Sequence, residues 1–498
     1  MKKSTLPRNA SMAVMQVIVS GVVLFFLYRY LLKTIGVEMV GVWAVVLATV
    51  SASRISDLGF VGSTVKFTAK YLAQGDRKRA ADVIQTSLST IAVVLGGGLW
   101  LGHDFIAWLM GKFIPQSHII DAVAVLPYAL LSAWVGAIAA VFASGLEGCQ
   151  RIDVRVTISL LGNVFFLFFV WMFLPQHGLI GLAWAQIGQG LFLLLGNFVM
   201  LRRQLTSLPL LPVQWSYTLF REMLRYGVNF QAVSFFSMMF DPVTKALMAK
   251  FGGLDSTAYY EMASRMVMQF RMLLISANQV VVPKVAEQAE NAPDGIINTY
   301  LSTYGLVFFI SSLLFTSLAA SVPLISDLWL GQYNQHFVEY SLLLALGYWF
   351  NSLVGPAYFV NLGTGHLQWN TVSHVVIGIL NLFMSYMLGL LFGGLGVALG
   401  YVLALIAGCL VIIVGSHRDY QIPMPSVIPR ESRHFFIACM IGLLNGWLVF
   451  HCMSLVDQPF DVAKLSLITC LALIALAAWR HPLRQSIYRQ MLLAGKDN

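Results

Sequence analysis

Long apolar segments recur along the whole chain and alternate with short polar connections. Each segment, at roughly 20 residues, is long enough to cross a bilayer as a helix. We place about fourteen of them, at 12–33, 38–60, 85–110, 119–147, 153–175, 178–201, 224–250, 256–282, 299–325, 337–362, 369–391, 393–416, 434–455 and 460–480. Stretches such as 22–27 and 471–476 are apolar at every position, whereas a transmembrane strand alternates at every second residue. The pattern therefore predicts an all-α integral membrane protein.

Lysine and arginine concentrate in every second connection. If the N-terminus lies in the cytoplasm, most of the 31 basic residues fall on that same side. The outer connections then hold only Lys33, Lys112, Lys250 and Lys464. Cytoplasmic loops of membrane proteins carry such an excess. We therefore expect both termini in the cytoplasm, and we interpret the net charge of +9 as a sign of topology rather than of nucleic-acid binding.

Composition and motifs narrow the chemistry. Hydrophobic residues make up 58% of the chain and charged residues 11%, against about 25% charged in soluble domains. The longest connections, at 202–223 and 417–433, are too short for an extramembrane domain. The sequence lacks a nucleotide-binding loop, an HExxH motif and a Ser/His/Asp arrangement, and its five cysteines have neither metal-site nor CxxC spacing. We expect a transporter rather than an enzyme, with no metal and no cofactor.

The chain contains a weak internal repeat. Residues 31–36 and 247–252 share an apolar start, a lysine and a final glycine, and each stretch leads into a helix with an arginine and then a basic segment. The offset is about 216 residues. An even number of spans per half places both halves in the same orientation. We predict two six-helix lobes, 1–201 and 224–416, related by a pseudo-two-fold axis along the membrane normal, with a cytoplasmic linker at 202–223 and two appended helices plus a tail at 417–498.

The stretch 56–76 carries a family resemblance. It contains Asp57-Leu58-Gly59, then Lys66, Tyr71 and finally Gly75-Asp76. It resembles the end of the second helix in polysaccharide flippases, including O-antigen flippases, of the multidrug/oligosaccharidyl-lipid/polysaccharide exporter superfamily. The family often has arginine where this chain has Lys66. The second half is similar where residues 226–229 enter the seventh span.

The resemblance implies a two-lobed, V-shaped bundle in the bacterial inner membrane. It would move an undecaprenyl-pyrophosphate-linked oligosaccharide from the cytoplasmic to the periplasmic leaflet by alternating access, during synthesis of O-antigen, capsule or exopolysaccharide. Implied partners are this lipid-linked substrate, the membrane lipids, and possible polymerase and chain-length machinery.

Ionisable residues at membrane depth are the candidate site. Each costs about 2.5–3.5 kcal/mol on insertion scales, so it usually faces a partner or a watery cavity. Helical spacing pairs Arg54 with Asp57, Asp241 with Lys245, and Glu261 with Arg265. Five cations against three acids suit a pyrophosphate, to which arginine offers a bidentate fork. The predicted cationic cavity consists of Arg29, Arg54, Lys245, Arg265 and Arg271.

Each assignment has a plainer alternative. The three pairs could be structural locks between helices, and Arg29 could extend to the outer interface between Tyr28 and Tyr30. Alternatively, the three acids could couple transport to protons. Polar side chains at helix contacts are common and contribute about 0.6 kcal/mol each. Candidate sugar contacts among them are Asn229, Gln231, Asn370 and His374.

Two other functions compete with the flippase. A multidrug-type cation antiporter of the same superfamily needs an acidic site left uncompensated, whereas every deep acid here has a basic neighbour in sequence. A membrane enzyme of polysaccharide assembly generally needs a sizeable outer loop, which the short connections do not provide.

Overall fold

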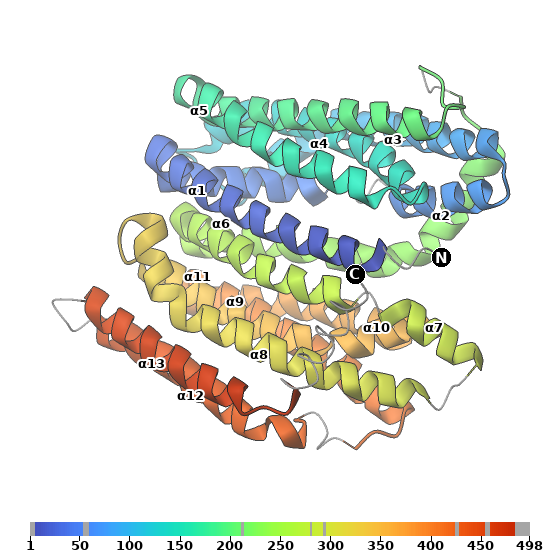
Figure 1. The fold of residues 1–498 in the computed structure, drawn as a ribbon. Helices are drawn as coiled ribbons and strands as arrows, with labels where there is room; N and C mark the ends of the chain where they lie inside the picture. Colours follow the sequence, from blue (N-terminus) through green and yellow to red (C-terminus); the bar gives the residue numbers. More distant parts are fainter. Residues whose placement is uncertain are drawn as a thin grey trace. The chain divides into compact units, whose positions relative to one another are not determined.

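The computed structural model describes residues 5–52, 59–210, 214–278, 281–291, 295–423, 428–453 and 459–483, and these residues contain no strand. Figure 1 shows the chain as a series of long helices. The helices are α1 (Thr5–Ala52), α2 (Phe60–Ala73), α3 (Arg77–Met110), α4 (Ile119–Gly148), α5 (Ile152–Gln204), α6 (Tyr217–Asn278), α7 (Val281–Asn291), α8 (Gly295–Leu330), α9 (Gln335–Leu353), α10 (Gly355–Thr364), α11 (Gln368–Asp419), α12 (Arg433–Met453) and α13 (Pro459–Trp479). The all-α prediction is confirmed.

The chain divides into two compact units. The first consists of Met1–Glu261 with Ser385–Val397, and the second of Met262–Met384 with Ala398–Asn498. The first unit therefore holds α1 to α5 and most of α6, while the second holds α7 to α10, α12, α13 and most of α11. The lobes expected at 1–201 and 224–416, the linker at 202–223 and the appended segment at 417–498 stay predictions.

Four of the longest helices are interrupted by a glycine with positive φ. Gly36 in α1 and Gly253 in α6 have nearly the same backbone angles, with φ and ψ of 81° and 170° and of 82° and 177°. Gly178 in α5 and Gly393 in α11 form a second matched pair, at 53° and −131° and at 59° and −140°. Only glycine adopts these conformations without a steric cost. Each break falls at a predicted junction between consecutive spans.

The matched glycines support the internal repeat at the level of the backbone. The members of each pair are about 216 residues apart, the offset expected from the sequence. The turns after the second pair also agree, since a Cβ added at Gly181 would collide with the carbonyl of Phe173, and one at Gly396 with that of Leu388. Each half therefore builds the same helical hairpin in the same way.

Gly59, Gly75 and Asp76 of the stretch 56–76 lie at helix ends. Gly59 is the N-cap of α2, with a left-handed φ of 74°, and Gly75 has a φ of 77° in the turn that follows the helix. Asp76 then caps α3, because its side chain accepts a hydrogen bond of 2.9 Å from the backbone N–H of Arg79. The Gly-Asp signature thus has a local structural reason, the reversal from α2 into α3.

Many helices are long and apolar enough to cross a membrane. Within the described part of the chain, seven helical segments satisfy this by length and composition: Met15–Ser51, Arg77–Met110, Ile119–Gly148, Ile152–Gln204, Gly295–Leu330, Gln335–Thr364 and Gln368–Asp419. Three of these contain one of the glycine breaks. Every predicted span overlaps a described helix. A multi-pass membrane protein follows, although the number of fourteen spans stays a prediction.

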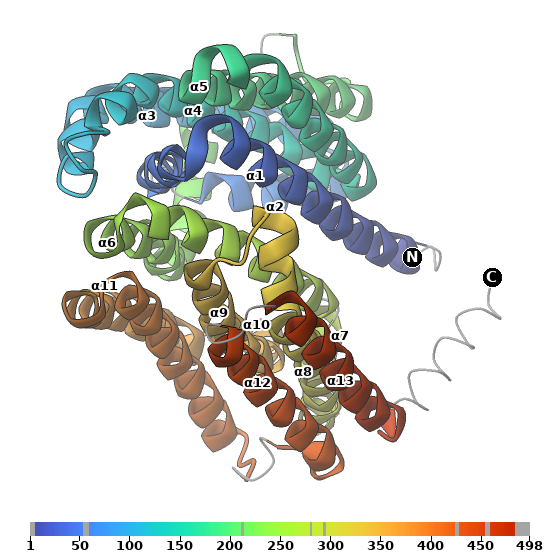
Figure 2. The same cartoon turned by 90° about the vertical axis from the view of Figure 1, so that its left-hand side faces the viewer.

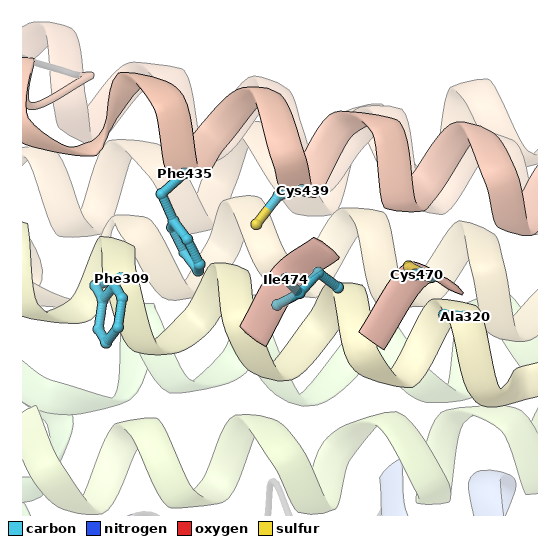
Figure 3. Packing of buried hydrophobic residues seen from close by; sticks show 6 residues of the cluster. All are labelled: Phe309, Ala320, Phe435, Cys439, Cys470 and Ile474. Atoms are coloured by element: carbon cyan, nitrogen blue, oxygen red, sulfur yellow. The ribbon is translucent and has the colours of Figure 1, made fainter. Parts of the chain in front are cut away.

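The last two helices pack on α8 within the second unit (Figures 1 and 2). Their contact is an apolar cluster of Phe309 and Ala320 from α8, Phe435 and Cys439 from α12, and Cys470 and Ile474 from α13 (Figure 3). The Phe309 and Phe435 rings have centroids 4.9 Å apart. Two of the five cysteines therefore serve as small apolar core residues, as expected from their surroundings in the sequence.

Candidate functional site

A buried group of charges lies in the first unit, where α6 bends at Gly253. The Lys245 side chain is 2% exposed, and its ammonium lies 2.6 Å from a carboxylate oxygen of Asp241 and 2.6 Å from one of Glu261. Glu261 is equally buried, whereas Asp241 is 51% exposed. Tyr28 of α1 donates a hydrogen bond of 3.3 Å to the second oxygen of Glu261. We call Tyr28, Asp241, Lys245 and Glu261 the lysine cluster.

The balance of charge in the lysine cluster is negative when all its groups are ionised. One ammonium faces two carboxylates, so Lys245 brings no surplus positive charge to a substrate. A buried ammonium is costly without close partners, and here both partners are at contact distance. The cluster can hold α1 and the two parts of α6 together, and half-exposed Asp241 gives it a route to water and protons.

A second polar group lies in the second unit and is centred on Arg271. Its Nε donates a hydrogen bond of 2.8 Å to the amide oxygen of Asn351 in α9. The guanidinium lies 5.5 Å from the ring centroid of Tyr348, within cation–π range. Tyr348 in turn exchanges a hydrogen bond of 2.8 Å with Tyr401. Arg271 is therefore oriented by an amide and a ring. The bond to Asn351 uses only the Nε of the guanidinium.

Aromatic and amide side chains form a connected group near this arginine. The charge of Arg271 is close enough to act on Tyr358 and His374, whose rings are 6.1 Å apart. His374 Nδ1 hydrogen-bonds the backbone oxygen of Asn370 at 2.8 Å, and Asn370 itself accepts a bond of 2.9 Å from Asn361. We call Arg271, Asn351, Tyr348, Tyr358 and His374 the arginine cluster. A guanidinium in such surroundings can bind a phosphate, and the aromatic rings beside it can stack against a sugar.

Comparison with known families decides the identity of the chain. Residues 71–339, more than half of the sequence, match the family described as "Polysaccharide biosynthesis protein". The chain belongs to this family. The matched range includes Asp241, Lys245, Glu261 and Arg271, so the charged groups of both clusters lie in the part that defines the polysaccharide biosynthesis family.

Solved structures of transporters share the fold of this polysaccharide biosynthesis protein. The lipid II flippase MurJ in an inward closed conformation is 14% identical over 97% of this chain and 99% of its own, with a TM-score of 0.71. An inward-facing multidrug resistance MATE family transporter of the MOP superfamily is 14% identical, and the match covers 80% of this chain and 94% of that transporter, with a TM-score of 0.70. A MOP superfamily transporter from Pyrococcus furiosus is 13% identical, and the match covers 83% of this chain and 95% of that transporter, with a TM-score of 0.59.

At identities this low, the likeness to solved structures establishes the fold alone. Among curated proteins, no sequence matches the chain. The resemblance to the polysaccharide exporters of this superfamily, inferred from the stretch 56–76, is confirmed at the level of family and fold.

The predicted site residues have different outcomes. Asp241 and Lys245 pair as their spacing predicts, and Arg271, Asn370 and His374 lie in or beside one polar group. Arg29 and Arg265 have exposed side chains, and their role as cavity cations stays a prediction, as does the pair of Glu261 with Arg265. Arg54 and Asp57 lie outside the described residues, and Asn229 and Gln231 are on α6 with side chains outside the description.

Sequence reasoning missed several partners. The bond between Lys245 and Glu261 spans 16 positions and depends on the bend at Gly253, so helical spacing does not reveal it. The sequence indicates only an interfacial position for Tyr28, and Tyr348 gives no signal beyond being aromatic. Nothing in the sequence distinguishes Asn351 from the other amides in the spans. The one sequence signal for this contact is Gly253, where the helix breaks and brings Glu261 back toward Lys245.

Proposed function

We propose that this protein translocates an undecaprenyl-pyrophosphate-linked oligosaccharide from the cytoplasmic to the periplasmic leaflet of the bacterial inner membrane by alternating access, with both termini in the cytoplasm. Membership of the polysaccharide biosynthesis family and a fold shared with a lipid II flippase support this role. On this proposal the chain moves its substrate without changing it chemically. The substrate serves O-antigen, capsule or exopolysaccharide synthesis, and a polymerase with its chain-length machinery takes up the product.

The arginine cluster is the observation that carries the proposal. A pyrophosphate needs a cation that stays charged at membrane depth, and arginine meets this condition because its guanidinium is not deprotonated in proteins. Arg271 is half-buried, and its oriented guanidinium lies beside Tyr348 and in electrostatic range of Tyr358 and His374. The same combination does not suit an organic cation, which Arg271 would repel.

Accumulation of lipid-linked repeat units in a deletion strain tests the function. We expect these units to collect on the cytoplasmic face of inside-out vesicles, and to disappear when the wild-type gene is expressed again. The Arg271→Gln variant, expressed at the same level, should restore little export. Normal translocation in the deletion strain, with other flippases also removed, would contradict the proposal.

A multidrug-type cation antiporter is the second candidate, because one observation favours it. The lysine cluster holds two carboxylates, and one of them, Asp241, is half-exposed. Cation resistance upon overexpression that disappears in Asp241→Asn, with glycan export unaffected by deletion, would support this function instead.

Proton coupling is a separate part of the flippase proposal. Asp241 and Glu261 share Lys245, so protonation of one carboxylate leaves the ammonium matched by the other. Asp57, which lies outside the described residues, belongs with them in this role. Collapse of the proton gradient should slow export by the wild-type protein. An export rate that stays the same would remove proton coupling and leave the flippase function intact.

A further inference from the structure

A basic pocket lies in the first unit at the ends of α2 and α6, on the predicted cytoplasmic side. Its volume is about 1090 Å³. Four cations and one carboxylate line it: Lys66, Lys70, Arg221, Arg225 and Glu222. The pocket is separate from the lysine cluster and from the arginine cluster, because it shares no residue with either.

The cations of this pocket differ in their partners. Lys70 lies 3.0 Å from a carboxylate oxygen of Glu222, and the Lys66 ammonium lies 3.7 Å from the ring centroid of Tyr226. Within the described part of the chain, Lys66, Arg221 and Arg225 have no carboxylate at salt-bridge distance, and all three side chains are exposed. The pocket therefore presents surplus positive charge to solvent.

The pocket is built on fixed elements rather than on a loose loop. Ser63 of α2 donates a hydrogen bond of 3.1 Å to the backbone oxygen of Met223 in α6. The segment before α6 is held on α3, where Trp215 donates to Thr90 at 3.1 Å. The first turn of α6 also lines the pocket through Tyr217. The N–H groups of a helix N-terminus favour an anion at this place.

We propose that this pocket binds the diphosphate headgroup of a polyprenyl-linked substrate at the cytoplasmic face, before the substrate enters the transport path. The proposal rests on the flippase function. Lys66, Arg221 and Arg225 hold the phosphate oxygens, and arginine does so through its planar fork. The volume exceeds what a single phosphate needs, and the rings of Phe67 and Tyr226 provide a wall for the first sugar. The diphosphate also competes with Glu222 for Lys70.

Binding of undecaprenyl diphosphate to the purified full chain in zwitterionic nanodiscs tests the proposal. Removing one cation near a phosphate should weaken binding about fivefold. We expect this effect for Lys66→Gln and for Arg225→Gln. Glu222→Gln should instead strengthen binding severalfold, because it removes the competitor for Lys70. Lys78→Gln is the matched control, since Lys78 is an exposed cation on α3 that does not line the pocket, and it should bind like the wild type.

Two results would overturn the proposal. The first is equal binding by wild type, Lys66→Gln and Arg225→Gln. The second is displacement of the probe by phosphatidylglycerol at equal headgroup concentration, which would assign the pocket to an anionic phospholipid. Failure of the pocket and failure of the flippase function are distinguishable. If the substitutions alter binding but no lipid-linked units are trapped in the deletion strain, only the flippase function is contradicted. If the substitutions leave binding unaltered but units are trapped, only the pocket proposal is contradicted.

Discussion

The Lys245 ammonium and the Glu261 carboxylate lie 2.6 Å apart on opposite sides of the glycine break in α6, and each side chain is 2% exposed. The pair joins two helical segments that leave Gly253 in different directions. Because Tyr28 also reaches Glu261, the same contact ties α1 to this bend. The geometry of the helical hairpin and the placement of the charges therefore depend on each other.

Loss of Lys245 should destabilise the protein strongly. Lys245→Met leaves Asp241 and Glu261 without their shared cation, and breaking a buried pair from one side costs about 3–5 kcal/mol. Thermal unfolding in detergent should show a clear decrease of Tm. The double variant Lys245→Met with Glu261→Gln should recover much of the loss, because it leaves no uncompensated buried charge. Equal Tm values for the single variant and the wild type would contradict the pairing.

Alanine at Gly253 should also destabilise the fold. The residue has a φ of 82° and a ψ of 177°, a region that is essentially restricted to glycine and that costs an L side chain about 1–3 kcal/mol. Gly97→Ala is the matched control, because Gly97 is helical and a Cβ there meets nothing within 4 Å. We expect a lower Tm for Gly253→Ala and an unchanged or higher Tm for Gly97→Ala. The same Tm in both variants would argue against the break at Gly253.

The Lys70–Glu222 bridge predicts a pH dependence. The hydrogen bond to Glu222 raises the pKa of Lys70 above its ordinary value. The stabilisation is therefore complete below the ordinary pKa of lysine and disappears as pH rises through the raised pKa of the folded state. Only the neutral amine reacts with acylating reagents, so Lys70 should be labelled more slowly than in Glu222→Gln at pH 9 to 10, a range chosen around the lysine pKa of about 10.4. Lys78 is the internal control, and equal labelling of Lys70 in both proteins would contradict the bridge.

Arginine at position 271 should matter for more than its charge. Arg271→Lys keeps a cation but loses the fork and the bond from Nε to Asn351. We expect export to fall about tenfold or more, since one lost charge-assisted hydrogen bond corresponds to roughly 1.5–3 kcal/mol and each step of about 1.4 kcal/mol is a factor of ten. Arg271→Gln should lower export further, while Arg418→Gln, an exposed cation at the end of α11, serves as the control. Full export by Arg271→Lys would show that charge alone is sufficient.

Much of the fold follows from local features of the sequence. Apolar length predicts the helices, and the glycines at 36, 178, 253 and 393 fall where consecutive spans were expected to meet. The site follows less well, because its contacts join positions that are distant in sequence. Helical spacing gives Asp241 as a partner of Lys245 but not Glu261, which reaches it only through the bend. Likewise, nothing near Arg271 in sequence indicates Asn351, which is 80 positions away on α9.

The most direct test of the flippase function is translocation by the purified protein in liposomes. A lipid-linked oligosaccharide is placed in both leaflets, and its exposure at the outer surface is followed with a membrane-impermeant reagent that modifies the sugar. We predict that the wild type makes nearly all of the substrate accessible, that Arg271→Gln leaves about half protected, and that Arg418→Gln behaves like the wild type. Protection of half the substrate with the wild-type protein, as in empty liposomes, would contradict the account.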